Sequence, residues 1–211
     1  INIGRLVPQI VYYVYAYASL VRQGKIKDGQ EINVVVPTGN FGNILAAYYA
    51  KQMGLPVHKL ICASNDNKVL YDFFRTGTYD RKRDFILTTS PSMDILISSN
   101  LERLLYHLCG EDTEKLTGWM NALQSGGAYT VDAATADAVR ALFYGGCCDD
   151  KETVEVIRNT FEKDGYLCDT HTAVAVGVYE QYLKETGDNT PAVIASTASP
   201  YKFPDSVLDA F

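Results

Sequence analysis

The chain has 211 residues and a formal net charge of −6, with 47% hydrophobic and 21% charged residues. This length allows one well-packed hydrophobic core, and the composition is ordinary for a globular protein. The acidic balance argues against a nucleic-acid or anionic-membrane partner, because both bind to basic surfaces.

The chain begins at Ile1 without a methionine, close to its most apolar stretch, and we expect it to be part of a longer protein. That stretch, residues 6–21, is shorter than the roughly 20 residues that cross a bilayer, and Pro8 and Gln9 interrupt it. We predict a helix over about residues 4–23 that is buried on nearly all sides, and no membrane partner.

Strand and helix signals alternate in the next part of the chain. Residues 32–36 are rich in β-branched side chains and predict a buried strand. A helix at residues 44–53 and a second strand at residues 57–63 follow. Strand, helix and strand at this spacing indicate an α/β fold with an open, mostly parallel sheet and helices on both of its faces.

The remaining chain is predicted to be mostly helical. Its expected elements are a helix at 67–76, a strand near 85–87, a helix at 99–108, a helical stretch at about 110–165, a helix at 172–184 and a buried strand at 192–196. Ser99 and Glu102 form a capping box, Asp169 caps the helix at 172–184, and a short helix follows Pro204. The helical stretch would pack on the edge of the sheet or bridge it, and residues 145–150 are its loosest point.

The five cysteines are Cys62, Cys109, Cys147, Cys148 and Cys168. Their spacing fits neither a zinc site nor a CxxC redox motif, so we predict no metal site. Free thiols are typical of a reducing cytosol, which predicts a cytoplasmic protein.

The loop from Gly39 to Asn43 is the most informative part of the sequence. It connects a predicted strand to a helix, where free N–H groups and the helix dipole favour an anion. Gly39 and Gly42 would let the backbone wrap around a phosphate, and Asn40 and Asn43 can add donors. The GxxG spacing matches neither a Walker A loop nor a dinucleotide-binding motif. On spacing alone, a phosphate site and a plain tight turn both remain open.

Other polar residues follow predicted strands or begin helices. Thr197 follows the last strand, where its hydroxyl could bind an uncharged ring nitrogen or serve a turn. His171 could be an acid or base, or simply a polar first-turn residue. We interpret residues 65–67 as a solvated turn and residues 92–94 as a loop with a capping carboxylate. Together, polar loops at one side of a parallel sheet suggest a small-molecule site that handles phosphate.

Five segments, in order, resemble motifs of threonine synthases. They are residues 1–5 (INIGR, against NSINxxR), 37–43 (PTGNFGN, against PSGNFGN/D), 92–103 (SMDI and SNLER, against AMDI and SNxER), 169–174 (DTHTAV, against DPHTAVG) and 197–203 (TASPYKF, against TAHPAKF). Ser199 replaces the histidine of the last motif, and Thr170 replaces a proline.

The resemblance implies the tryptophan-synthase-β-like fold of pyridoxal-phosphate enzymes, with residues 1–211 forming the C-terminal part of the cofactor-binding large domain. It implies conversion of O-phospho-L-homoserine and water into L-threonine and phosphate. By this resemblance, backbone N–H groups of Gly39, Asn40, Phe41, Gly42 and Asn43 would bind the phosphate of pyridoxal 5'-phosphate.

Thr197 would then hydrogen-bond the pyridine nitrogen, and Asn2, Arg5 and Lys202 would contact cofactor or substrate. The family's Schiff-base lysine lies in the N-terminal half, and none of the eleven lysines here stands in such a setting. We therefore predict that the chain contains no catalytic residue, is inactive alone and has the missing N-terminal half as its partner.

Three alternatives stay open at this stage. Another enzyme of the same fold, such as a threonine dehydratase or a cysteine synthase, would keep the cofactor and change the reaction. A non-catalytic, flavodoxin-like ligand-binding module would not depend on pyridoxal phosphate. A natural pseudoenzyme would lack the lysine by evolution.

Overall fold

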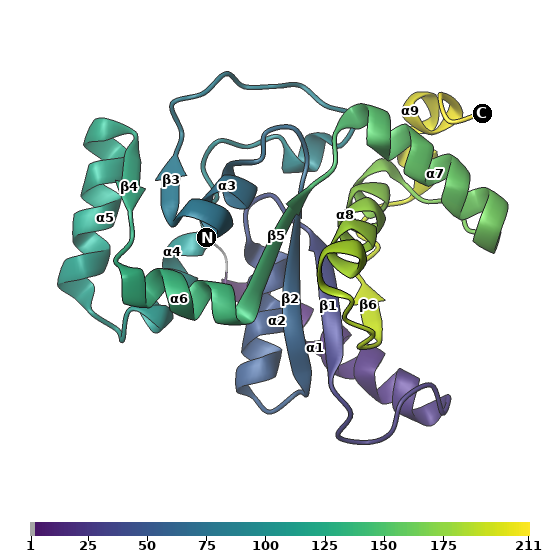
Figure 1. Cartoon of the computed structure of the whole chain (residues 1–211), viewed down its shortest axis with the longest axis horizontal. Coiled ribbons are helices and arrows are strands. Elements are labelled where there is room, and N and C mark those ends of the chain that lie inside the picture. The colour runs from purple at the N-terminus through teal and green to yellow at the C-terminus, as the bar shows by residue number, and fades with distance from the viewer. Residues whose placement is uncertain (1–2) are drawn as a thin grey trace.

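The computed structural model describes residues 3–211 and has a four-stranded parallel sheet at its centre, in the order β5-β2-β1-β6 (Figure 1). The strands are β1 (Ile32–Pro37), β2 (Val57–Ser64), β5 (Phe143–Cys147) and β6 (Ala192–Ile194). All three strand pairs are parallel, which confirms the prediction of a parallel sheet.

Helices cover both faces of this sheet (Figure 1). The α-helices are α1 (Ile3–Arg22), α2 (Gly42–Gln52), α3 (Val69–Thr76), α4 (Leu101–Leu108), α5 (Thr113–Gly126), α6 (Ala133–Leu142), α7 (Asp150–Asp164), α8 (Thr170–Thr186) and α9 (Pro204–Leu208). Short 3-10 turns, η1 (Pro91–Met93) and η2 (Pro200–Lys202), complete the described elements.

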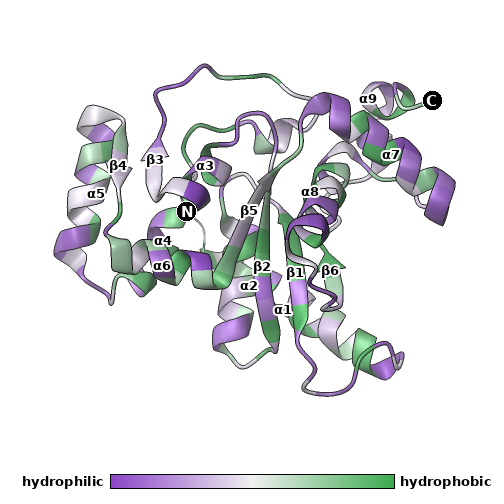
Figure 2. Cartoon of the chain, in the orientation of Figure 1, coloured by the Kyte–Doolittle hydropathy of each residue, from purple (hydrophilic) through white to green (hydrophobic). Residues whose placement is uncertain are grey.

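The side chains of β1 alternate between two apolar layers, as the pleat of a strand requires. Val34 and Val36 face the larger cluster, which includes α2 and α3. Val35 faces the other cluster, where Val174 and Val178 of α8 cover it. Figure 2 shows these central strands as predominantly hydrophobic and the outlying α7 as predominantly hydrophilic. The open α/β fold predicted from the sequence is therefore confirmed.

Helix α1 is less buried than the sequence suggested. Leu6, Tyr13 and Tyr17 are buried, and α1 packs against α2. Tyr12 and Tyr15, however, are 70% and 64% exposed, so burial on nearly all sides was wrong. No helix among residues 3–211 is long and apolar enough to span a membrane.

The helical stretch predicted at about residues 110–165 contains α5, α6 and α7 but also two strands. Phe143, which lies within that predicted helical stretch, begins the edge strand β5, and its ring stacks on Phe74 at 5.4 Å. Gly145 and Gly146 are buried in this strand rather than in a loose linker. A Cβ on Gly146 would lie 2.5 Å from Val178 Cγ1, so the glycine permits close approach of α8.

The predicted strand near residues 85–87 was also wrong. Phe85 and Leu87 lie in an exposed loop. The strand forms earlier, as β3 (Thr78–Asp80), and pairs antiparallel with β4 (Ala128–Thr130). Tyr79 of β3 stacks on Tyr129 of β4 at 5.5 Å, a pairing between residues distant in the sequence.

Two further local predictions differ from the structure. Asn100, not Ser99, precedes α4, and no side-chain capping bond forms there. β6 is a short edge strand that ends at Ile194 and is only half-buried, because it has one neighbouring strand.

Residues 65–67 form a buried hydrogen-bond network rather than a solvated turn. Asn65 and Asn67 are buried, and their side-chain amides donate to Asp94 Oδ1 at 2.8 and 3.0 Å. Asp94 Oδ2 also accepts from the Thr88 backbone N–H at 3.0 Å. The network fixes the loop from Thr88 to Asp94 against the carboxyl end of β2.

The predicted cap of α8 is confirmed and has a second function. Asp169 accepts from the backbone N–H groups of His171 and Thr172 at 2.9 and 3.3 Å. Buried His171 lies between Asp169, 3.2 Å from Nδ1, and Ser92, whose N–H donates to Nε2 at 3.2 Å. The start of α8 therefore holds η1 in place.

Asp169 should make the stability of the fold depend on pH. Burial alone would raise the pKa of Asp169, but hydrogen bonds from His171 and Thr172 outweigh it and lower the pKa. A lowered folded-state pKa means that this stabilisation is complete above the unfolded value of about 4 and is lost as the pH falls through the folded value. Asp169→Asn should lower the free energy of unfolding at neutral pH by about 1–2 kcal/mol.

Urea denaturation of the unaltered chain and of Asp169→Asn, repeated at decreasing pH, tests this expectation. The difference between them should shrink below about pH 4. Asp112→Asn, at the solvent-exposed cap of α5, is the matched control and should have the smaller effect. If Asp169→Asn lowers the free energy of unfolding by the same amount at every pH, the lowered pKa of Asp169 is contradicted.

Candidate functional site

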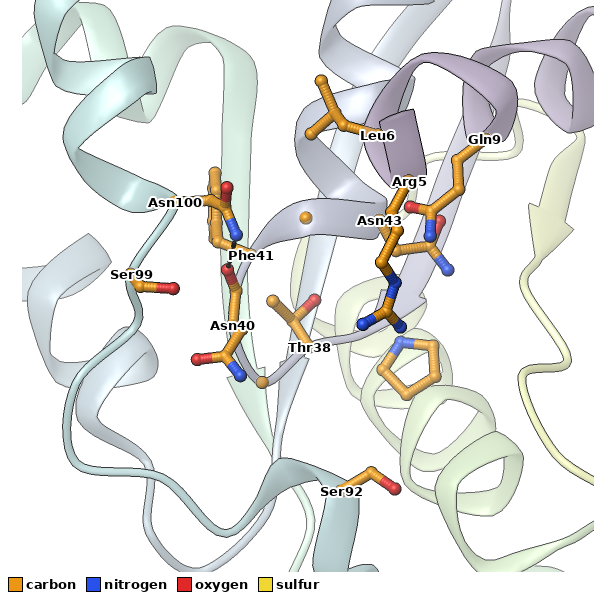
Figure 3. A pocket seen from close by; sticks show the side chains of 13 residues that line it. Arg5, Leu6, Gln9, Thr38, Asn40, Phe41, Asn43, Ser92, Ser99 and Asn100 are labelled. Carbon is orange, nitrogen blue, oxygen red and sulfur yellow. Dashed lines mark hydrogen bonds between the residues drawn. The ribbon is translucent and has the colours of Figure 1, made fainter. Parts of the chain in front are cut away.

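A cavity of about 450 Å³ lies against the loop that joins β1 to α2 (Figure 3). Four parts of the chain form its wall: the loop itself, α1, η1 and the segment before α4. The lining residues are Arg5, Leu6, Gln9, Pro37, Thr38, Gly39, Asn40, Phe41, Gly42, Asn43, Ser92, Ser99 and Asn100. The structure thus places all five predicted loop residues at one cavity.

Phe41 determines how the loop enters α2. Its φ of 63° is left-handed, and it precedes the helix without a side-chain cap. The ring is 1% exposed and lies 5.8 Å from Phe143 and 6.2 Å from Phe74. With the side chain in the core, only the backbone of Phe41 is available to a ligand.

The amide N–H groups of the loop are free to bind an anion. The first N–H groups of a helix have no acceptor within the helix. For residues 39–43, no acceptor for these groups occurs anywhere within residues 3–211. A row of unpaired donors at a helix N-terminus favours a phosphate or a carboxylate.

The two glycines of the loop have different reasons to be glycine. A Cβ on Gly39 would lie 2.6 Å from the Ser92 carbonyl oxygen, so this position must let η1 approach. A Cβ on Gly42 would meet only the Asn100 Nδ2, at 3.6 Å, which is an ordinary contact. Nothing within the described chain therefore requires glycine at 42, whereas a ligand close to the backbone would.

Two side chains of α1 lie next to this loop. Arg5 extends toward Thr38 in Figure 3 and has no ion-pair partner among the described residues. It adds positive charge beside the loop. The Tyr13 hydroxyl donates to Asn43 Oδ1, and burial raises the pKa of Tyr13, which keeps this donor protonated. Asn43 is thereby fixed to α1, with its amide nitrogen still available.

A second cavity, of about 540 Å³, contains the predicted ring-contact residue Thr197. Gln9 and Asn43 line both cavities, which therefore meet at these two side chains. Thr197 is exposed. The structure thus brings Thr197 beside the loop at residues 39–43, although Thr197 lies 154 positions after Asn43 in the sequence.

One of the weaker predictions is not brought into the site. Lys202 lines neither cavity, and its Nζ lies 5.4 Å from the centre of the Phe203 ring. Asn2 lies outside the described residues. Of the two departures from the family motifs, Thr170 is buried at the start of α8, and Ser199 is exposed before η2.

Several lining residues had not been predicted, notably Gln9, Ser99 and Asn100. Gln9 could have been found, because it follows Arg5 by four residues and so shares its helix face. Ser99 and Asn100 share no such spacing with Arg5, although both stand in the SNLER motif. They reach the cavity through the fold of the chain between η1 and α4.

Comparison with known proteins matches residues 172–211 to the family model "Threonine synthase, C-terminal". Over its whole length, the chain is 45% identical to human threonine synthase-like 1, covering 28% of that protein. It is 40% identical to the threonine synthase of Schizosaccharomyces pombe, with 98% of the chain covering 44% of that enzyme. The chain is homologous to the C-terminal part of threonine synthases.

Solved structures agree with this assignment. The PLP-bound threonine synthase of Brucella melitensis matches the whole chain with a TM-score of 0.91 and 43% identity, over 43% of its own length. Yeast threonine synthase gives the same TM-score at 37% identity. The fold is therefore that of threonine synthases, which is tryptophan-synthase-β-like. The chain spans less than half the length of these relatives.

The two loop glycines of this threonine synthase homologue provide a test of the cavity. Gly39→Ala should lower the free energy of unfolding by about 1–3 kcal/mol, because the methyl group would overlap the η1 backbone. Gly42→Ala should change it by less than about 1 kcal/mol, since the added group makes only an ordinary contact with Asn100 Nδ2. Urea denaturation of both variants measures the difference. Equal losses of stability would show that Gly42 is also needed for packing.

Proposed function

We propose that this chain is the cofactor-binding C-terminal part of a threonine synthase, a PLP-dependent lyase of threonine biosynthesis. The complete enzyme would convert O-phospho-L-homoserine and water into L-threonine and phosphate. The observation that carries this proposal is the row of N–H groups at residues 39–43, which have no acceptor within residues 3–211. They lie at a cavity that Arg5 also lines, and Arg5 has no ion pair in that same part of the chain.

The residues present fit pyridoxal 5'-phosphate at both of its ends. The loop N–H groups suit the phosphate dianion, and Gly42 leaves space for it to approach the backbone. Thr197, in the adjoining cavity, offers a neutral hydroxyl to the pyridine nitrogen. A hydroxyl donates a hydrogen bond without giving up a proton, so it holds the ring in place and leaves that nitrogen uncharged.

When bound, the cofactor supplies an electron sink that stabilises carbanions of an amino-acid substrate. The N–H groups of residues 39–43 would bind and orient it, and Arg5 would add positive charge at its phosphate end or at the substrate. Asn2 and Lys202 remain candidates for further contacts.

The lysine that holds the cofactor and moves protons would come from the N-terminal half of the enzyme. No lysine lines either cavity of the described chain. We therefore infer that residues 1–211 alone are inactive and that their functional partner is that N-terminal half. The five free cysteines support a reducing compartment such as the cytoplasm.

Binding of the cofactor is the direct test. The chain should bind PLP, measured by the change in cofactor absorbance and fluorescence. Gly42→Ala should weaken binding by about tenfold, because a methyl group in the cradle displaces the phosphate from its donors. Gly118→Ala on α5, where the added Cβ meets nothing within 4 Å, is the matched control. No PLP binding by the unaltered chain would overturn the proposal.

Covalent trapping tests the missing lysine. After incubation with PLP and reduction with borohydride, mass spectrometry should find no single lysine modified in stoichiometric amounts. The chain should also release no phosphate from O-phospho-L-homoserine, because the proton-transfer group is absent. Stoichiometric labelling of one of the eleven lysines, or release of phosphate, would contradict the inferred inactivity.

A further inference from the structure

We infer that Ser98 and Asn100 are positioning residues for the phosphate loop, because they fix the direction in which two of its N–H groups point. This inference rests on the proposed function. Neither residue was a predicted site residue, and neither need touch the cofactor for the effect.

The two residues bind the carbonyl oxygens of the loop. Ser98 Oγ donates to the Gly39 carbonyl at 2.8 Å. Asn100 donates twice to the Asn40 carbonyl, from Nδ2 at 2.7 Å and from its backbone N–H at 3.2 Å. Figure 3 shows the side-chain bond from Asn100 to Asn40 as a dashed line.

These bonds set the orientation of two peptide planes. In a planar trans peptide, the C=O of one residue and the N–H of the next point in opposite directions. The carbonyl of Gly39 shares a plane with the N–H of Asn40, and the carbonyl of Asn40 shares one with the N–H of Phe41. With both carbonyls held by the 98–100 segment, both N–H groups must point away from it, where no described residue accepts them.

Asn100 is held in this position at a cost. Its Oδ1 is buried without a hydrogen-bond partner among the described residues. An unpaired buried acceptor is unfavourable, because it has given up its hydrogen bonds to water. The hydrogen bond from Asn100 Nδ2 to the Asn40 carbonyl thus forms although the Oδ1 of the same amide is placed unfavourably.

Tyr79 extends this support away from the cavity. Its hydroxyl donates to the Leu96 carbonyl at 3.1 Å and accepts from the Ser98 N–H at 2.7 Å. Burial raises the pKa of Tyr79 to about 12, so the hydroxyl remains a donor. Through Ser98, the small β3–β4 sheet therefore holds the backbone of the phosphate loop.

The test compares two ligands that differ only in the phosphate, PLP and pyridoxal. Asn100→Ala and Ser98→Ala in the 211-residue chain should each raise the Kd for PLP about tenfold, while the Kd for pyridoxal changes less than about twofold. Tyr79→Phe, which keeps the ring, should have the same selectivity with a smaller effect. Ser98→Thr, which keeps the hydroxyl, should restore PLP binding.

Gln181→Ala is the matched control. Gln181 also donates from a side-chain amide to a backbone carbonyl, that of Cys147 at 2.9 Å, but it does not line either cavity of the site. It should leave both Kd values unchanged. If Asn100→Ala fails to fold, Asn100→Leu, which has a similar size and removes the side-chain donor without adding charge, decides the question.

The outcomes separate this inference from the function on which it rests. Equal loss of PLP and pyridoxal affinity, or no loss of either, would show a merely structural role and overturn the inference. If the unaltered chain binds PLP no more tightly than pyridoxal, the loop is not a phosphate site, and the proposed function fails together with the inference.

Discussion

The site depends on one residue whose side chain and backbone serve different purposes. Phe41 buries its ring among Phe74 and Phe143 while its backbone adopts a left-handed conformation at the start of α2. That conformation costs a non-glycine residue about 1–2 kcal/mol, and full burial of the ring contributes roughly 1.5–3 kcal/mol. The two effects are comparable, so the core can hold the strained turn that leaves the loop N–H groups unpaired.

The other supports of the loop come from distant parts of the chain. η1 lies against Gly39, and it is held by His171 at the start of α8 and by the buried Asp94 network. On another side, Ser98 and Asn100 bind the loop carbonyls. The bonds from Ser98 and Asn100 occupy carbonyl oxygens of the loop and not its N–H groups. The N–H groups of residues 39–43 therefore keep no acceptor within residues 3–211 and stay available to a ligand.

The sequence predicted the central elements well where the local pattern was strong. β1, α2 and β2 are continuous apolar segments with clear glycine and proline boundaries, and the Asp169 cap follows from a residue type in a fixed position. The prediction from the sequence failed for β3 and β5. Short strands carry little periodicity of their own, and Gly145 and Gly146 look like a linker until Phe74 and α8 are seen packed against them.

For the site, the sequence by itself determined the residue types that can form an anion loop, the cation of Arg5 and the family motifs that connect them. Only the tertiary structure decided that Thr197 lies beside that loop and that Lys202 does not line it. It alone also showed that Asn100 orients the loop and that the polar residues 65–67 are buried. These facts depend on contacts between residues far apart in the chain, and local propensity contains no information about such contacts.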